Sequence, residues 1–146
     1  MPLPPFTNAG VLPPGIHHCT LDEVAASLGW SNRRRALIAR LRDYAGVLRD
    51  AWGGVAIVLD GSFVTSKDEP NDIDVVVMLN ELGLGSAEPK PHQSTSVHRP
   101  WVNRKYSEEI DLQVAATDGL AAHWSEYFSE VKGTPGSFKG LLRVTL

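Results

Sequence analysis

DGSFVTSKDEPNDIDVVVML, residues 60–79, combines a glycine–serine turn, a polar segment and two acids that open an apolar run. Asp72 and Asp74 stand two residues apart, so on a β-strand their side chains leave the same face with Cα atoms about 6–7 Å apart. Two carboxylates held this close in apolar surroundings repel each other unless a cation lies between them. Oxygen ligands favour Mg²⁺ or Mn²⁺, whose usual partner is a polyphosphate. The pattern therefore predicts a divalent-metal site at the start of a buried strand.

Two further runs of strand length lie on either side of this stretch. Residues 55–59 are uniformly apolar, and residues 109–115 alternate apolar with polar side chains. Asp111 faces away from its apolar neighbours, so it joins Asp72 and Asp74 if the two strands pair, although a register slip of one residue would swap which acid faces the site. Three carboxylates can hold two metal ions about 3.5–4 Å apart, one activating an attacking hydroxyl and the other anchoring a triphosphate.

The turn before the acids predicts a phosphate-binding element. Gly61 lets the backbone come close to a phosphate, and a turn that follows Ser62 points amide groups at it. Lys67, in the polar segment, and Lys139, near the end of the chain, are further candidate phosphate contacts.

The span from Gly61 to Asp74 resembles the signature of the polymerase-beta-type nucleotidyltransferase superfamily: Gly-Ser, nine intervening residues, then Asp-x-Asp opening an apolar strand, with a third Asp on a later strand. The resemblance implies that Gly61 and Ser62 bind the triphosphate. It also implies that Asp72 and Asp74 bind both metal ions, and that Asp111 completes the site and helps to deprotonate the acceptor hydroxyl. The implied fold is α+β (α/β), the nucleotidyltransferase fold, with a small mixed β-sheet and helices mainly on one face.

Nearly the whole chain is also similar to small bacterial proteins that share its "LPPGIHHCTLDE"-like start and "FKGLLRV"-like end and are described only as nucleotidyltransferase-like. The expected activity is Mg²⁺-dependent transfer of a nucleoside monophosphate from an NTP to a hydroxyl. A partner protein's side chain is the preferred acceptor and an RNA 3′ end the other acceptor class, because solitary minimal members resemble antitoxins or regulators.

Two other readings stay open. Val64 and Ser66 stand where minimal members of the superfamily carry Ala and a second Gly, so the chain can instead be a catalytically inactive binding module that sequesters a partner such as a toxin. In the third reading, the domain binds no metal and its acids only cap strand ends. Metal binding separates this reading from the first.

The rest of the chain predicts one domain, residues 20–146, after an extended proline-rich arm, residues 1–19. Thr20 and Glu23 form a capping-box pattern that starts a helix over about 20–28, and a second helix is expected from Ser31 or Asn32 to about Asp50. The remaining expectations are a long loop with at most a short helix over 80–105, a helix capped by Asp118, and a tail, 138–146, that returns to the sheet edge.

Several side chains outside the acidic motif allow two interpretations. The cluster Arg33–Arg35 is either a solvated helix rim, which is favoured, or a phosphate or RNA patch. Trp101, flanked by Arg99, Arg104 and Lys105, either packs in the core, which is favoured, or stacks on a base. His92 and His98 are expected in solvent. The aromatic residues expected in the core at helical spacing are Trp124, Tyr127 and Phe128.

The composition limits the class of protein. With 146 residues, of which 42% are hydrophobic, the chain can bury one sizeable core. A net charge of -3 and a pI near 5.9 exclude a generally basic surface for nucleic acid. Cys19 is the single cysteine and forms no internal disulfide, and the apolar runs are too short to span a bilayer. The expectation is a cytoplasmic protein without membrane partners.

Overall fold

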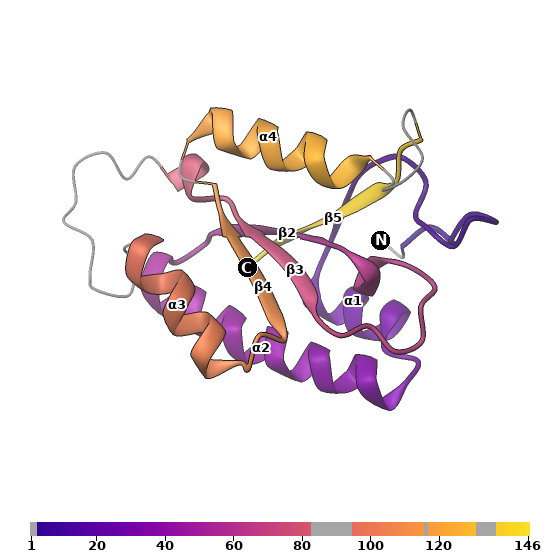
Figure 1. Ribbon diagram of the computed structural model, residues 1–146, viewed down its shortest axis with the longest axis horizontal. Helices are drawn as coiled ribbons and strands as arrows, with labels where there is room; N and C mark the ends of the chain where they lie inside the picture. Colours follow the sequence, from indigo (N-terminus) through magenta and orange to yellow (C-terminus); the bar gives the residue numbers. More distant parts are fainter. Residues whose placement is uncertain (1–2, 83–94, 116, 131–136) are drawn as a thin grey trace.

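The computed structural model describes residues 3–82, 95–115, 117–130 and 137–146, and within these ranges the chain forms one mixed sheet in the order β1-β5-β2-β3-β4 (Figure 1). The strands are β1 (Gly15–Cys19), β2 (Ala56–Asp60), β3 (Ile73–Val77), β4 (Ile110–Val114) and β5 (Gly140–Thr145). β1 runs parallel to β5 and β3 parallel to β4, whereas β2 is antiparallel to both of its neighbours. The predicted mixed sheet and α+β class are confirmed.

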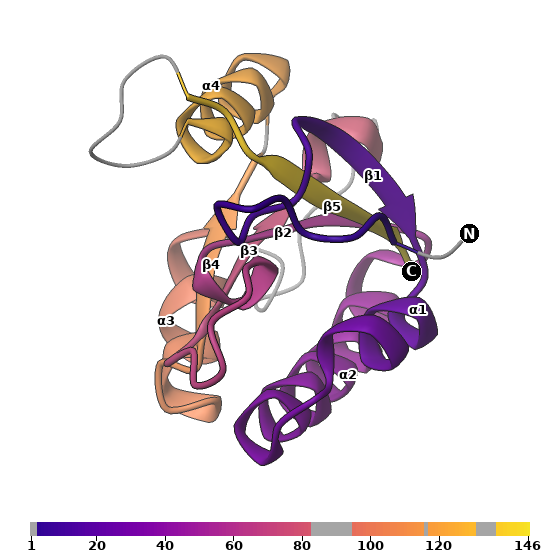
Figure 2. The same cartoon turned by 90° about the vertical axis from the view of Figure 1, so that its right-hand side faces the viewer.

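The helices cover both faces of the sheet, but mainly one. They are α1 (Leu21–Leu28), α2 (Asn32–Trp52), α3 (Thr95–Lys105) and α4 (Asp118–Ser129), with 3₁₀ turns η1 (Ser62–Val64) and η2 (Leu79–Leu82). Figures 1 and 2 show α1, α2 and α3 on one face and α4 alone on the other. Thr20 and Glu23 form the predicted capping box of α1, and the Ser31 side chain accepts from the Arg34 amide at the start of α2, so both predicted helices are confirmed.

The two faces of the sheet carry separate hydrophobic clusters. Ile73, Val75 and Val77 of β3 point into the larger cluster under α1, α2 and α3, whereas Val76 points into the smaller one, which includes Ala121 of α4. This alternation follows from the two-residue period of a strand. Asp74 therefore lies on the α4 face of the sheet, on the same side as Val76.

Within 80–105, where a long loop with at most a short helix was predicted, residues 95–105 form the helix α3. Pro100 lies inside this helix, where a missing amide and ring clashes normally cost about 3 kcal/mol. Burial offsets that cost: Val102 is fully buried and Tyr106, just after the helix, is 1% exposed. Residues 83–94, which include His92, lie outside the described ranges.

The tail forms β5, an interior strand rather than the predicted edge strand, because the last five residues of the expected arm, β1, pair with it and occupy the edge. At the other helix start, Thr117 rather than Asp118 is the N-cap, since its side chain accepts from the Leu120 amide. Tyr127 was expected in the core but is 51% exposed. α4 covers the sheet alone, so part of its circumference faces solvent.

Candidate metal centre

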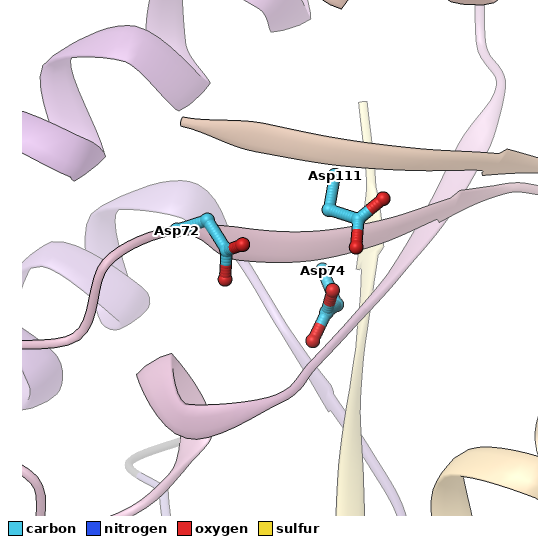
Figure 3. Close-up of side chains that lie close together, drawn as sticks. All are labelled: Asp72, Asp74 and Asp111. Atoms are coloured by element: carbon cyan, nitrogen blue, oxygen red, sulfur yellow. The ribbon is translucent and has the colours of Figure 1, made fainter. Parts of the chain in front are cut away.

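Three carboxylates meet where β3 and β4 begin. Asp72 directly precedes β3, Asp74 is the second residue of β3, and Asp111 is the second residue of β4. The parallel register pairs Asp74 with Asp111, so the two strands pair in the register that brings the acids together. One oxygen of each carboxylate lies within 4.8 Å of the other two, and Figure 3 shows the three groups gathered beside β3. The predicted acids are therefore brought together.

The electrostatics of this cluster indicate a deficit of positive charge. Burial, a hydrogen bond with Asp111 and the negative charges of Asp72, Asp111 and Asp60 raise the pKa of Asp74 from 3.8 to about 8. A divalent cation among these oxygens would remove the repulsion. The donor set consists of carboxylate oxygens, which suits hard cations such as Mg²⁺ and Mn²⁺, so the residues fit such an ion.

A fourth acid, Asp60, lies next to this cluster and was not assigned a role from the sequence. It ends β2 directly opposite Asp74 in the antiparallel register, and it is 1% exposed. The Lys139 ammonium lies 3.4 Å from its Oδ1, and that side chain is only 15% exposed. Lys139 is thus the counterion of the buried Asp60 carboxylate. The pairing of β2 with β3 could have predicted this position of Asp60, because it places the last residue of β2 beside the second residue of β3.

Gly61, which was predicted to contact phosphate, lies against Asp74. Its φ of 80° and ψ of -164° fall in a region that glycine occupies almost alone, and a Cβ at this position would overlap the Asp74 carboxylate. Ser62 follows at the start of η1, half-buried. Lys67 is exposed, and its described contacts run through its backbone, whose carbonyl accepts from Arg34.

The sequence matches a protein family described as "Family of unknown function (DUF6932)" over residues 4–145. The chain belongs to this family. The match includes the five strands that the structure describes and the three acids of the candidate metal centre, so this site lies inside the region that the DUF6932 family model covers. No curated protein and no solved structure matches it. In the part of the chain that the structure describes, none of the helices has the length and apolar content needed to span a bilayer.

The arginine cluster of this DUF6932 chain fits the favoured interpretation, a solvated helix rim, at Arg35 only. Arg34 is fully buried, with its guanidinium carbon 3.7 Å from the centre of the Trp30 ring, and it donates to backbone carbonyls. Burial lowers its pKa to about 10, so it stays charged at neutral pH. Arg33 also binds protein oxygens, while Arg35 is exposed and donates to the Gly29 carbonyl. Helical periodicity alone could not show that a loop distant in sequence supplies these acceptors.

Trp101 of α3 packs against the core, which is the favoured of its two interpretations. Trp101 is half-buried against the main core, 6.0 Å from the stacked His98 ring, and the Lys105 ammonium lies 5.6 Å from its centre. The prediction of a solvated His98 is wrong: the side chain is fully buried, 2.7 Å from the Tyr44 hydroxyl. Because it lies on a helix rather than a loop, its ring is directed into the core.

Proposed function

We propose that this protein transfers a nucleoside monophosphate from an NTP to a hydroxyl acceptor with the help of Mg²⁺ or Mn²⁺: the hydroxyl oxygen bonds to the α-phosphorus, the α–β anhydride bond breaks and pyrophosphate leaves. The observation that carries the proposal is the convergence of Asp72, Asp74 and Asp111 within 4.8 Å, beside a glycine that touches Asp74. The resemblance of the Gly61–Asp74 span to the polymerase-beta-type nucleotidyltransferase signature supports it.

Divalent ions bound to such a carboxylate set neutralise a triphosphate and make a hydroxyl more nucleophilic. The side chains have separate tasks in this scheme. Asp74, which is half-buried on β3, orients the site and must give up its proton before it can serve as a ligand. Asp111 is exposed and is therefore the carboxylate that an acceptor hydroxyl reaches, which suits it to take up the hydroxyl proton.

Gly61 and Ser62 form the triphosphate side of the proposed site. Because Gly61 has no side chain, a phosphate can approach the backbone next to Asp74, and η1 begins directly afterwards at Ser62. A small domain can support this reaction without a large nucleotide-binding domain, because phosphoryl-type transfer depends mainly on alignment and charge neutralisation.

A hydroxyl on a partner protein is the preferred acceptor, with an RNA 3′ end as the other class. The net charge is -3, and the Arg33 and Arg34 side chains donate to the protein's own carbonyls and Glu109 rather than being free for an RNA backbone. A regulatory or antitoxin role, in which a toxin is the modified partner, is consistent with this preference.

A second candidate function is a catalytically inactive module that binds a partner protein. The observation that favours it is the reshaped loop: Val64 is buried, and the Ser66 amide donates to the Gly10 carbonyl of the N-terminal arm. The loop is therefore tied to the arm at positions where minimal nucleotidyltransferases carry small residues.

The test incubates the purified protein with each α-labelled NTP and Mg²⁺ or Mn²⁺, alone, with total RNA and with cell lysate. An Asp72→Asn/Asp74→Asn variant removes the metal ligands, and Asp50→Asn, on the exposed end of α2, is the matched control. Label on protein or RNA that needs the two acids but not Asp50 supports the transferase and reveals the acceptor class. No transfer together with no metal-dependent NTP binding in calorimetry rejects it in favour of the binding module.

A further inference from the structure

Arg33 and Arg34, in the first turn of α2, bind two segments of the chain that lead to the candidate metal centre. Arg34 binds the first segment, residues 63–67. It makes five hydrogen bonds to four backbone carbonyls, those of Leu28, Phe63, Thr65 and Lys67. Three of these carbonyls belong to the loop after Gly61, so this buried guanidinium fixes the path of the chain from η1 to residue 67.

Arg33 reaches the second segment, which leads directly into the metal ligands. It donates from Nε to the Pro70 carbonyl at 3.0 Å and from Nη2 to the Asn71 carbonyl at 2.5 Å. Asn71 immediately precedes Asp72. The guanidinium therefore holds the backbone one residue before the first ligand.

The same guanidinium also binds the strand that carries the third ligand. Its Nη1 lies 2.5 Å from Oε2 of Glu109, which comes two residues before Asp111, and Arg40 approaches Oε1 of the same carboxylate at 3.4 Å. The Glu109 carbonyl accepts from the Ile73 amide at 2.9 Å. One side chain thus connects the starts of β3 and β4, the two strands whose first residues form the site.

The turn before Glu109 has a backbone conformation that few residues other than glycine adopt. Ser107 and Glu108 both have positive φ, 51° and 63°, although neither is glycine. Such residues each cost on the order of 1 kcal/mol and persist only when their surroundings fix them. The Arg33–Glu109 pair, with a half-buried carboxylate that is 19% exposed, is one contact that fixes the end of this turn.

We propose that Arg33 is a positioning residue that sets the separation between Asp72 and Asp111 by tying the backbone before one to the side chain before the other. The proposal rests on the metal site of the proposed function. Metal ligands lose affinity when the residues that orient them are removed, typically by about 10- to 100-fold. Arg33 supplies this support through a planar fork with several donors, which a lysine cannot reproduce.

The direction of the change in Mn²⁺ affinity when Arg33 is replaced distinguishes a positioning role from a purely electrostatic one. Removing a cation close to an acidic site should strengthen the binding of Mn²⁺ if Arg33 acts only through its charge. The positioning role predicts the opposite: Arg33→Ala weakens Mn²⁺ binding by about 10- to 100-fold. Arg33→Lys keeps the charge next to Glu109 but not the fork, so it should still weaken binding by several-fold, and it serves if the alanine variant does not fold.

The experiment measures Mn²⁺ affinity by calorimetry and by the paramagnetic resonance of free Mn²⁺ for the full chain, each variant being checked for folding by circular dichroism. Arg42→Ala is the matched control, because Arg42 lies on the same helix and its partner Asp22 is 88% exposed. Weaker binding in both Arg33 variants but not in Arg42→Ala supports the proposal. A lower melting temperature with unchanged affinity in the folded protein, or tighter binding, overturns it and leaves the transferase proposal intact. Absence of wild-type Mn²⁺ binding, or binding that survives Asp72→Asn/Asp74→Asn, overturns both.

Discussion

Replacing Asp74 with asparagine should stabilise the metal-free fold while abolishing metal binding. Without a cation, ionisation of Asp74 in the folded protein is opposed by its burial and by three neighbouring carboxylates. The alternative is that the folded protein keeps a proton on Asp74 that the unfolded chain releases. The pKa of Asp74 is about 8 in the fold, against an ordinary value of 3.8. Asparagine resembles the protonated carboxyl group in shape and can donate an N–H to Asp111, so it removes this conflict.

The magnitude and its pH dependence follow from the two pKa values. Between pH 3.8 and about 8 the folded state binds more protons than the unfolded state, so wild-type stability falls as the pH rises and levels off above that range. At pH 7 the ceiling is about 4 kcal/mol, because each pH unit is worth about 1.4 kcal/mol. Asp74 is only half-buried and solvent screens part of the repulsion, so the expected gain for Asp74→Asn is about 1–2 kcal/mol.

The assay is urea unfolding followed by circular dichroism at pH 4 and pH 7.5, in EDTA and in excess Mn²⁺. In EDTA the variant should match the wild type at pH 4 and exceed it at pH 7.5. In Mn²⁺ at 100 times its dissociation constant the order should reverse, since only the wild type gains about 2.7 kcal/mol. A variant that is less stable than the wild type by the same amount at both pH values in EDTA would refute the reasoning, because the ionised carboxylate would then carry no penalty.

Three further outcomes are expected. Lys139→Met should lower the free energy of unfolding by about 3 kcal/mol in urea titrations, because it leaves the 1% exposed Asp60 without its ammonium partner, and Asp60→Asn in the same chain should recover most of the loss. Gly61→Ala should destabilise the fold by about 2 kcal/mol or more, since its backbone is strained for alanine and its Cβ overlaps Asp74, whereas Gly46→Ala, in open space on α2, should stabilise it by up to about 1 kcal/mol. Binding of Mn²⁺ at pH 7 should release about one proton from Asp74, seen as a buffer-dependent enthalpy in calorimetry; an enthalpy independent of the buffer would contradict its raised pKa.

The acidic site was predictable because its geometry depends on local periodicity and a single pairing. Asp72 and Asp74 share a face by the two-residue period of a strand, and Asp111 joins them once β3 and β4 pair in the register that their apolar residues favour. The strands β2, β3 and β4 and the first two helices followed from the same kind of evidence, namely apolar runs and capping residues. Each of these signals is contained within about ten residues of sequence.

The features that sequence reasoning missed depend on contacts between distant segments. From the sequence, Arg34 is expected at a solvated position on α2. In the structure, carbonyl groups of the loop at Phe63–Lys67 accept hydrogen bonds from its buried side chain. Pro100 reads as a helix breaker until the burial of neighbouring apolar residues offsets its cost. In both cases, tertiary packing outweighs a local preference, and no window of sequence contains the partner.

The position of the arginines also bears on how metal binding relates to folding. The irregular segment from η1 to Asp72 contains no strand or long helix, yet Arg33 and Arg34 fix its backbone from α2, a helix that packs along the main core. The scaffold of the proposed site is therefore set by contacts that need no metal, and only the charge repulsion around Asp74 remains to be relieved. A cation should then add stability by mass action to an already folded chain, rather than fold it, as structural zinc does in small metal-dependent domains.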